Sequence, residues 1–106
     1  MRFLMTTTAG DQPDQQMMAE MDKFVTELSQ AGVLLATGGL DQGSRVTAKD
    51  GQITVTDGPF AEAKEAVISF ALVDVRSKDE AIELSQRFWR IIGNGAGYIQ
   101  QVYGPE

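Results

Sequence analysis

Apolar residues recur with helical spacing near the start of the chain. They follow one another at three- and four-residue intervals: Met17, Met21, Phe24, Val25 and Leu28. This spacing places side chains on one face of an α-helix. Asp14 precedes the stripe as a candidate N-cap, and Gly32 follows it as a stop. We therefore predict an amphipathic helix from about residue 14 to residue 31.

A second helix is predicted to begin at Ser77. The serine hydroxyl can accept a hydrogen bond from the Glu80 amide while the Glu80 carboxylate reaches back, which is the reciprocal capping box. The apolar stripe that follows again has helical spacing: Ala81, Leu84, Ser85, Phe88 and Ile92. Arg87 and Arg90 fall near the negative end of the helix dipole. Both helices are expected to pack one face against a sheet.

Strands are predicted at residues 2–7, 33–37 and 98–103, and a hairpin lies between the second and third of these segments. Asp50-Gly51 is typical of a type I′ turn, which needs positive φ at both central positions. Folding about this turn places apolar residues opposite apolar ones and polar opposite polar. The predicted pairs are Lys49 with Gln52, Ala48 with Ile53, Thr47 with Thr54 and Val46 with Val55.

Residues 66–75 are apolar on both faces of the strand that they predict. Two helices can cover one face of a sheet, so something else must cover the other. The order of elements predicts an α+β fold, a ferredoxin-like βαββαβ with an inserted β-hairpin, in one domain over residues 1–106. The uncovered face predicts a homodimer.

Composition narrows the classes of function. The 106 residues include no cysteine, which excludes thiol nucleophiles, and no histidine, so proton transfer must use a carboxylate, lysine, tyrosine or bound cofactor. The net charge of −6 and the scattered basic residues argue against nucleic acid as a partner. The first residues are too polar for a signal peptide or a membrane span. We expect a cytoplasmic protein with no membrane contact.

Residues 55–65, hereafter the signature segment, combine a tight turn with several charges. Turn chemistry accounts for these residue types: Asp57 can cap amides, Gly58 supplies an unusual φ, and Pro59 presets φ. Phe60 would then hold the turn against the core. The alternative interpretation is that the turn brings Asp57 to the mouth of a pocket. A carboxylate at the edge of an apolar cleft can act as a general acid or base.

The motif Asp57-Gly58-Pro59-Phe60-Ala61-Glu62, with Lys64-Glu65 after it and Val55-Thr56 before it, resembles the DGPF pattern of the YCII-related family. The looser matches around it extend the resemblance from about residue 24 to residue 93. The resemblance implies a dimeric α+β barrel. It also implies a cleft between helices and sheet, or between subunits, with the aspartate of the motif nearby.

The chain departs from the family pattern at charged positions. Better-studied relatives suggest a catalytic histidine and aspartate pair, of which this chain can supply the aspartate half, Asp57. Gly38 stands where relatives have an acidic residue, and the last strand reads Tyr98-Ile99-Gln100 in place of an acidic, apolar, basic pattern. A pocket lined by these positions is less polar than that of relatives and lacks an ion pair.

We assign Asp57 as the candidate catalytic residue. The candidate ligand-binding residues are Arg45, Phe60, Glu62, Lys64 and Tyr98. Arg45 can hold an anion or be a solvated strand arginine, and Tyr98 can present a phenol to a cleft or be a core residue with a solvated tip. The glycine-rich run at 93–97 follows a helix, so we interpret it as a flexible connection and not a phosphate loop. No spacing predicts a metal site, and no motif predicts a cofactor.

Three functions remain consistent with the sequence. The first is an enzyme, or a degenerate enzyme, that acts on a small molecule in a cleft near Asp57. The second is a noncatalytic small-molecule-binding dimer, which the missing histidine favours. The third is a regulatory interaction module, because domains that resemble this one occur beside sigma factors.

Overall fold

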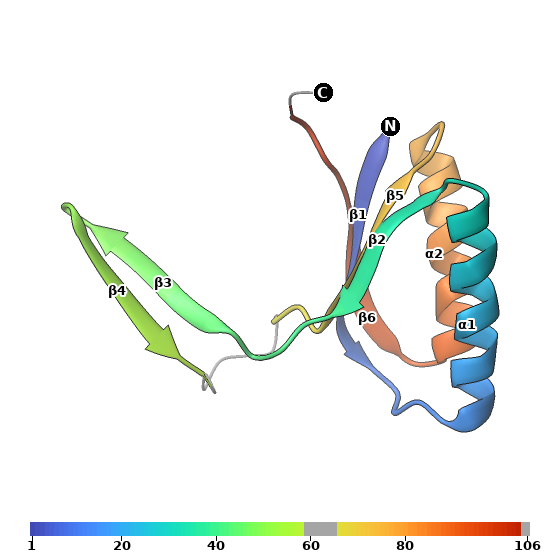
Figure 1. Ribbon diagram of the computed structural model, residues 1–106, viewed down its shortest axis with the longest axis horizontal. Helices are drawn as coiled ribbons and strands as arrows, with labels where there is room; N and C mark the ends of the chain where they lie inside the picture. The colour runs from blue at the N-terminus through green and yellow to red at the C-terminus, as the bar shows by residue number, and fades with distance from the viewer. Residues whose placement is uncertain (59–65, 105–106) are drawn as a thin grey trace.

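The computed structural model describes residues 1–58 and 66–104 of the chain. In this part of the chain the elements are, in order, β1 (Arg2–Gly10), α1 (Gln15–Gln30), β2 (Leu34–Gly39), β3 (Ser44–Lys49), β4 (Gln52–Asp57), β5 (Ser69–Asp74), α2 (Lys78–Ile92) and β6 (Gly95–Gln101). Figure 1 shows the two helices on one side of a sheet and the β3–β4 hairpin on the other. The predicted order of strands and helices is confirmed.

The main sheet is antiparallel, with the strand order β2-β5-β1-β6. Each strand–helix–strand unit therefore spans one intervening strand, which is the ferredoxin-like arrangement. β5 lies inside the sheet, between β2 and β1. It lies within the run at residues 66–75 that is apolar on both faces. The α+β class is confirmed, with a ferredoxin-like order of strands, while the dimer stays a prediction.

Helix α1 has the boundaries that its sequence predicts. Asp14 is the N-cap, and its Oδ1 accepts a hydrogen bond from the Met17 amide at 2.8 Å. This bond satisfies one of the amides that a helix start leaves without an intrahelical partner. Ala31 is the C-cap, and Gly32 follows in the left-handed region with φ 74°.

Helix α2 begins as predicted, but its cap differs in one half. Ser77 Oγ accepts a hydrogen bond from the Glu80 amide at 3.1 Å. The predicted return bond from Glu80 is wrong, because the Glu80 carboxylate accepts from the backbone N and the Nε of Arg76 instead, each at 3.3 Å. The ion pair with the arginine side chain draws the carboxylate one residue further back along the chain.

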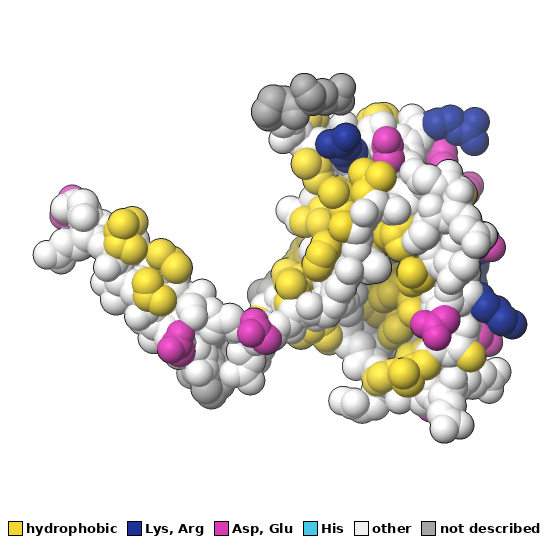
Figure 2. Space-filling view, in the orientation of Figure 1, with side chains coloured by type: hydrophobic (Ala, Val, Ile, Leu, Met, Phe, Trp, Pro, Cys, Tyr) yellow, Lys and Arg dark blue, Asp and Glu magenta, His cyan; other side chains and the backbone are white. Residues whose placement is uncertain are grey.

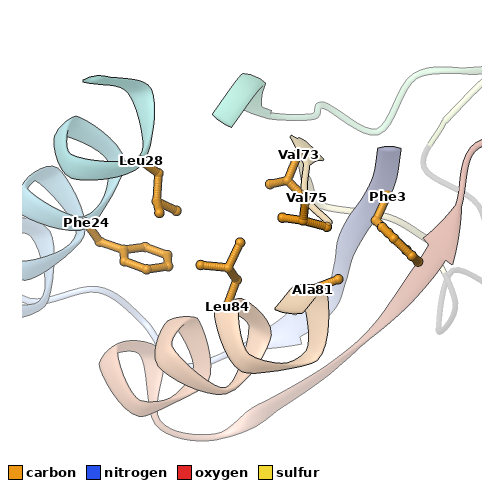
Figure 3. Packing of buried hydrophobic residues seen from close by; sticks show 7 residues of the cluster. All are labelled: Phe3, Phe24, Leu28, Val73, Val75, Ala81 and Leu84. Atoms are coloured by element: carbon orange, nitrogen blue, oxygen red, sulfur yellow. The ribbon is translucent and has the colours of Figure 1, made fainter. Parts of the chain in front are cut away.

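The hydrophobic core lies between the two helices and the sheet. Its buried members come from β1, α1, α2, the end of β5 and the residue just after it: Phe3, Phe24, Leu28, Val73, Val75, Ala81 and Leu84. In Figure 3, Leu84 of α2 lies between the α1 side chains and the two valines. Helix α2 therefore packs against both α1 and the sheet side of the core.

The hairpin has the predicted turn and register. Asp50 and Gly51 have φ 50° and 80°, as a type I′ turn requires. The observed pairs are those predicted, Lys49 with Gln52, Ala48 with Ile53, Thr47 with Thr54 and Val46 with Val55. The apolar side chains on one face of the hairpin are exposed, with Ile53 at 72%.

The strands differ from prediction at their ends. β1 and β6 continue past a bulge after Thr7, where Ala9 pairs with Ala96 and Gly10 with Gly95. The prediction of a flexible connection at residues 93–97 is therefore wrong for residues 95–97, which form a strand. A Cβ at position 97 would overlap the Thr6 carbonyl oxygen, so the close approach of β1 requires glycine there. β5 is shorter than the predicted 66–75.

Neither α1 nor α2 combines the length and the apolar composition that a bilayer-crossing helix needs.

Candidate functional site

The helix-facing side of the sheet changes in side-chain size from one end to the other. Residues opposite each other on neighbouring strands share a face, so their side chains form rows across the sheet. Near the end of β5 the row is Leu34, Val73 and Phe3. The next row is Thr37, Ala71, Met5 and Ile99. The row after it, hereafter the small row, is Gly39, Ser69, Thr7 and Gly97.

A cleft of about 580 Å³ lies between the sheet and the helices. Ser69, Thr7 and Gly97 of the small row line it. The helices contribute apolar side chains opposite: Met21, Phe24, Val25, Phe88, Trp89 and Ile92. Figure 2 shows hydrophobic side chains in the hollow between sheet and helices. Small-molecule sites in proteins have volumes of about 300–1,000 Å³, so this cleft has the size of a ligand site.

The polar groups of the cleft are mainly hydroxyls. They come from the sheet and from α2, and include Thr7, Thr37, Ser69 and Ser85. Thr7 is buried, and Thr37 Oγ1 donates to the Phe70 carbonyl at 2.8 Å. Among the described residues that line the cleft, Lys78 carries the one charged side chain and no carboxylate is present. The cleft can offer a ligand hydroxyl donors and acceptors in apolar surroundings.

Tyr98 is the one predicted ligand-binding residue within the described ranges that the structure brings to this cleft. It is among the residues that line the cleft and is 51% exposed, but it lies in β6 opposite Thr6, so its side chain belongs to the row on the side of the sheet without helices. This exposure decides between neither of the two interpretations, because a core residue with a solvated tip is also partly exposed. Its part in ligand binding stays a prediction.

Asp57 and Arg45 lie in the hairpin and do not line the cleft. Asp57 pairs with Ser44, whose Oγ donates to Asp57 Oδ1 at 2.6 Å, and Arg45 pairs with Thr56. Successive strand residues point to opposite faces. Asp57 therefore shares the apolar face of the hairpin with Val55, while Arg45 lies on the polar face. The hairpin does not bring these two side chains together.

The other predicted site residues, Phe60, Glu62 and Lys64, lie outside the described residues. The chain just after them rejoins the sheet beside the cleft. The Ile68 amide donates to the Thr7 carbonyl at 2.7 Å, and the Leu40 amide donates to the Ile68 carbonyl at 2.9 Å. The small row begins at the next residue, Ser69. Residues 66–68, which follow the signature segment in the sequence, thus lead into a strand that forms part of the floor of the cleft.

Sequence reasoning missed the residues that make the cleft. Thr7, Ser69 and Gly97 stand in three different strands, and each is unremarkable in its own segment. The available signal is a small or hydroxyl residue at a helix-facing position of each strand, but the residues can be matched into one row only when the pairing is known. Within residues 1–58 and 66–104, no group of three or more Asp or Glu side chains is arranged to hold a metal ion.

The strand order and the cleft define the class of protein: an α+β protein of ferredoxin-like topology with a small-molecule-sized cleft between helices and sheet. The model of the YCII-related domain matches residues 1–96. The chain therefore belongs to the YCII-related family, which confirms the resemblance read from the signature segment.

Two proteins are similar to this chain, one in sequence and one in structure. An uncharacterized protein of Rhizobium meliloti is 29% identical over 84 residues, which are 76% of this chain and 68% of that protein. A solved structure of the 5-chloro-2-hydroxyhydroquinone dehydrochlorinase from Burkholderia phenoliruptrix, in complex with 2,5-dihydroxybenzoquinone, is 16% identical. It has a TM-score of 0.47 over 99% of this chain and 96% of that chain. A likeness of this degree says nothing about the chemistry of this chain.

Proposed function

We propose that this protein binds a small organic molecule in the cleft between the helices and the sheet. The observation that carries the proposal is the small row. Protein interiors are close-packed, so an apolar space of about 580 Å³ between two helices and a sheet is not what ordinary packing leaves open. Apolar walls with a few hydroxyls are typical of ligand sites.

A thermal-shift screen against small polar metabolites and aromatic compounds tests this proposal. We expect at least one compound to raise the melting temperature of the wild-type protein. The variant Ser69→Leu should abolish that shift because the larger side chain fills the cleft. The same exchange at Ser29, which is exposed on α1 and does not line the cleft, should leave the shift unchanged. A compound that stabilises all three proteins equally would bind elsewhere and would contradict the proposal.

Catalysis by Asp57 is a second candidate function. The feature that favours it is the 2.6 Å hydrogen bond from Ser44, which holds the carboxylate at the base of the hairpin. The hairpin projects from the sheet (Figure 1), so in a dimer it can reach a partner subunit. Under this candidate, Asp57→Asn keeps the fold and ligand binding but loses turnover of the bound compound. Undiminished turnover in that variant would leave binding as the function.

We also propose that the protein forms a homodimer through the side of the sheet without helices. That side carries Leu4, Phe70 and Leu72, since their neighbours Phe3, Ala71 and Val73 face the helices. Figure 2 shows hydrophobic side chains there and on the hairpin. A second copy would bring the same two apolar surfaces, as a two-fold interface requires.

Sedimentation at low micromolar concentration tests the dimer. We expect a dimer for the wild type and a monomer for Val55→Asp, which places a charge on the apolar face of the hairpin. Thr54→Asp adds the same charge on the polar face and should stay dimeric. A wild-type monomer at this concentration would contradict the dimer while leaving the cleft proposal intact.

A further inference from the structure

We infer that the ligand of the cleft is an uncharged ring compound, aromatic and carrying a hydroxyl or carbonyl group. The charges of the described residues that line the cleft disfavour cations and polyanions. This inference rests on the proposed function, because it names the class of molecule that the same cleft takes.

The walls of the cleft favour a ring. Phe24, Phe88 and Trp89 line it, and the last two pack edge to face with ring centroids 5.2 Å apart and an interplanar angle of 82°. Met5 and Met21 line it as well. Aromatic rings pack favourably against other aromatic rings and against thioether sulfur. A small acyclic polar molecule would leave these surfaces without comparable contacts.

The floor of the cleft favours a flat molecule. Gly97 has no side chain, and Ser69 and Thr7 add no more than a hydroxyl and a methyl group beyond their Cβ atoms. Glycine at position 97 is fixed by the close approach of β1, because a Cβ there would overlap the Thr6 carbonyl oxygen. A planar ring can therefore lie close to the strand backbone.

The charges of the cleft set the charge of the ligand. No Asp or Glu is among the described residues that line it, so an ammonium group would be buried without a partner. Lys78 is in the first turn of α2, at the far end of that helix from Ile92. Ile92 lies near Gly10, beside the end of β1 that carries the small row. One distant lysine does not balance a di- or triphosphate.

The hydroxyls of the cleft set the polar group of the ligand. Thr7, Ser69 and Ser85 can each donate and accept one or more hydrogen bonds. A phenol or a ring carbonyl matches such partners. An unsubstituted ring would cover these hydroxyls without replacing the hydrogen bonds that they make to water, so it is disfavoured.

A trio of compounds with one common ring tests the class: para-butylphenol, para-butylbenzoate and para-butylbenzylamine. Trp89 is the sole tryptophan of the chain and lines the cleft, so its fluorescence reports occupancy directly. We expect the phenol to bind at least about tenfold more tightly than the amine, with the benzoate between them. Titration calorimetry gives the same affinities independently of fluorescence.

Variants link the binding to the cleft. Ser69→Leu and Ser85→Leu, on opposite walls, should each weaken phenol binding at least about tenfold, and circular dichroism checks that each is folded. Ser29→Leu should not change the affinity. If the amine or a phosphorylated metabolite binds best and Ser69→Leu or Ser85→Leu abolishes that binding, the ligand class is overturned and the proposed function stands. If neither the trio nor the metabolite screen yields a compound sensitive to these variants, both are overturned.

Discussion

The two ends of the helix–sheet interface share the same helices and the same strands, yet large core side chains pack together at one end, while small side chains form the floor of the cleft at the other. At the packed end Phe3 and Val73 are opposite each other and almost fully buried. Four residues away on the same strands, past Met5 and Ala71, the pair is Thr7 and Ser69. The difference shows that side-chain size along the strands, and not the path of the backbone, decides where the cleft lies.

The packed end keeps the cleft from closing. Leu84 and Val73 belong both to the core and to the inner wall of the cleft, so they hold α2 away from the sheet. Small side chains further along cannot bridge that separation. A protein selected for stability alone would fill such a space, because unfilled volume forfeits dispersion contacts.

Removing a large side chain from the packed end should cause the largest loss of stability. Phe3→Ala is expected to lower the free energy of unfolding by about 3–5 kcal/mol, since it leaves a closed cavity. The same exchange at Phe88, which is half-buried and already faces the cleft, should cost about 1–2 kcal/mol. Urea unfolding of both variants measures the difference. Equal losses would mean that the two ends are packed alike.

Substitutions of the two glycines at the edges of the small row should differ in their cost to stability. Gly97→Ala is expected to cost about 1–3 kcal/mol because the new methyl group meets the backbone of β1. At Gly39 the nearest atom to an added Cβ is the Ile68 carbonyl oxygen at 3.9 Å, an ordinary contact. Gly39→Ala should therefore be neutral or slightly stabilising. Thermal unfolding compares the pair, and a costly Gly39→Ala would show that the small row is constrained along its whole length.

The packed end and the hairpin could be predicted from the sequence because their signals are local. The stripe from Met17 to Leu28 and the Asp50-Gly51 turn each lie within one segment, and helical spacing or turn geometry fixes them. The resemblance to the family could also be recognised from one segment, because its most specific motif lies in the signature segment. The apolar run at 66–75 also identified the interior strand, although its ends were misjudged.

The cleft could not be predicted because it depends on how distant strands align. Bulges after Thr7 and after Leu34 shift the register, and a shift of one residue moves a side chain to the other face of the sheet. The pleat likewise decides how the two candidate site residues of the hairpin, Asp57 and Arg45, lie relative to each other. The two residues lie in paired strands, but the pleat directs them to opposite faces of the hairpin.

Side-chain hydrogen bonds near the two ends of α2 allow a comparison with smaller expected effects. Ser77→Ala removes the N-cap near the packed end, and Asp11→Ala removes the carboxylate that accepts from the Asn94 backbone N at 3.0 Å and its Nδ2 at 3.2 Å near the cleft. Each should cost about 1 kcal/mol. Amide hydrogen exchange should rise in the first turn of α2 for Ser77→Ala and around Asn94 for Asp11→Ala. Faster exchange along all of α2 in either variant would mean that the helix opens as one unit.

The ion pair on the outer side of the helices should have the smallest effect. Arg87 contacts Glu27 at 2.7 Å and also lies 4.9 Å from the centroid of the Phe24 ring. Both charged side chains are about half exposed, so Glu27→Gln should cost no more than about 0.5 kcal/mol, and less at high salt. If core packing sets the spacing of the helices, this variant should also leave the affinity of the cleft for its ligand unchanged. A changed affinity, measured by Trp89 fluorescence, would show that the ion pair and not core packing controls the opening of the cleft.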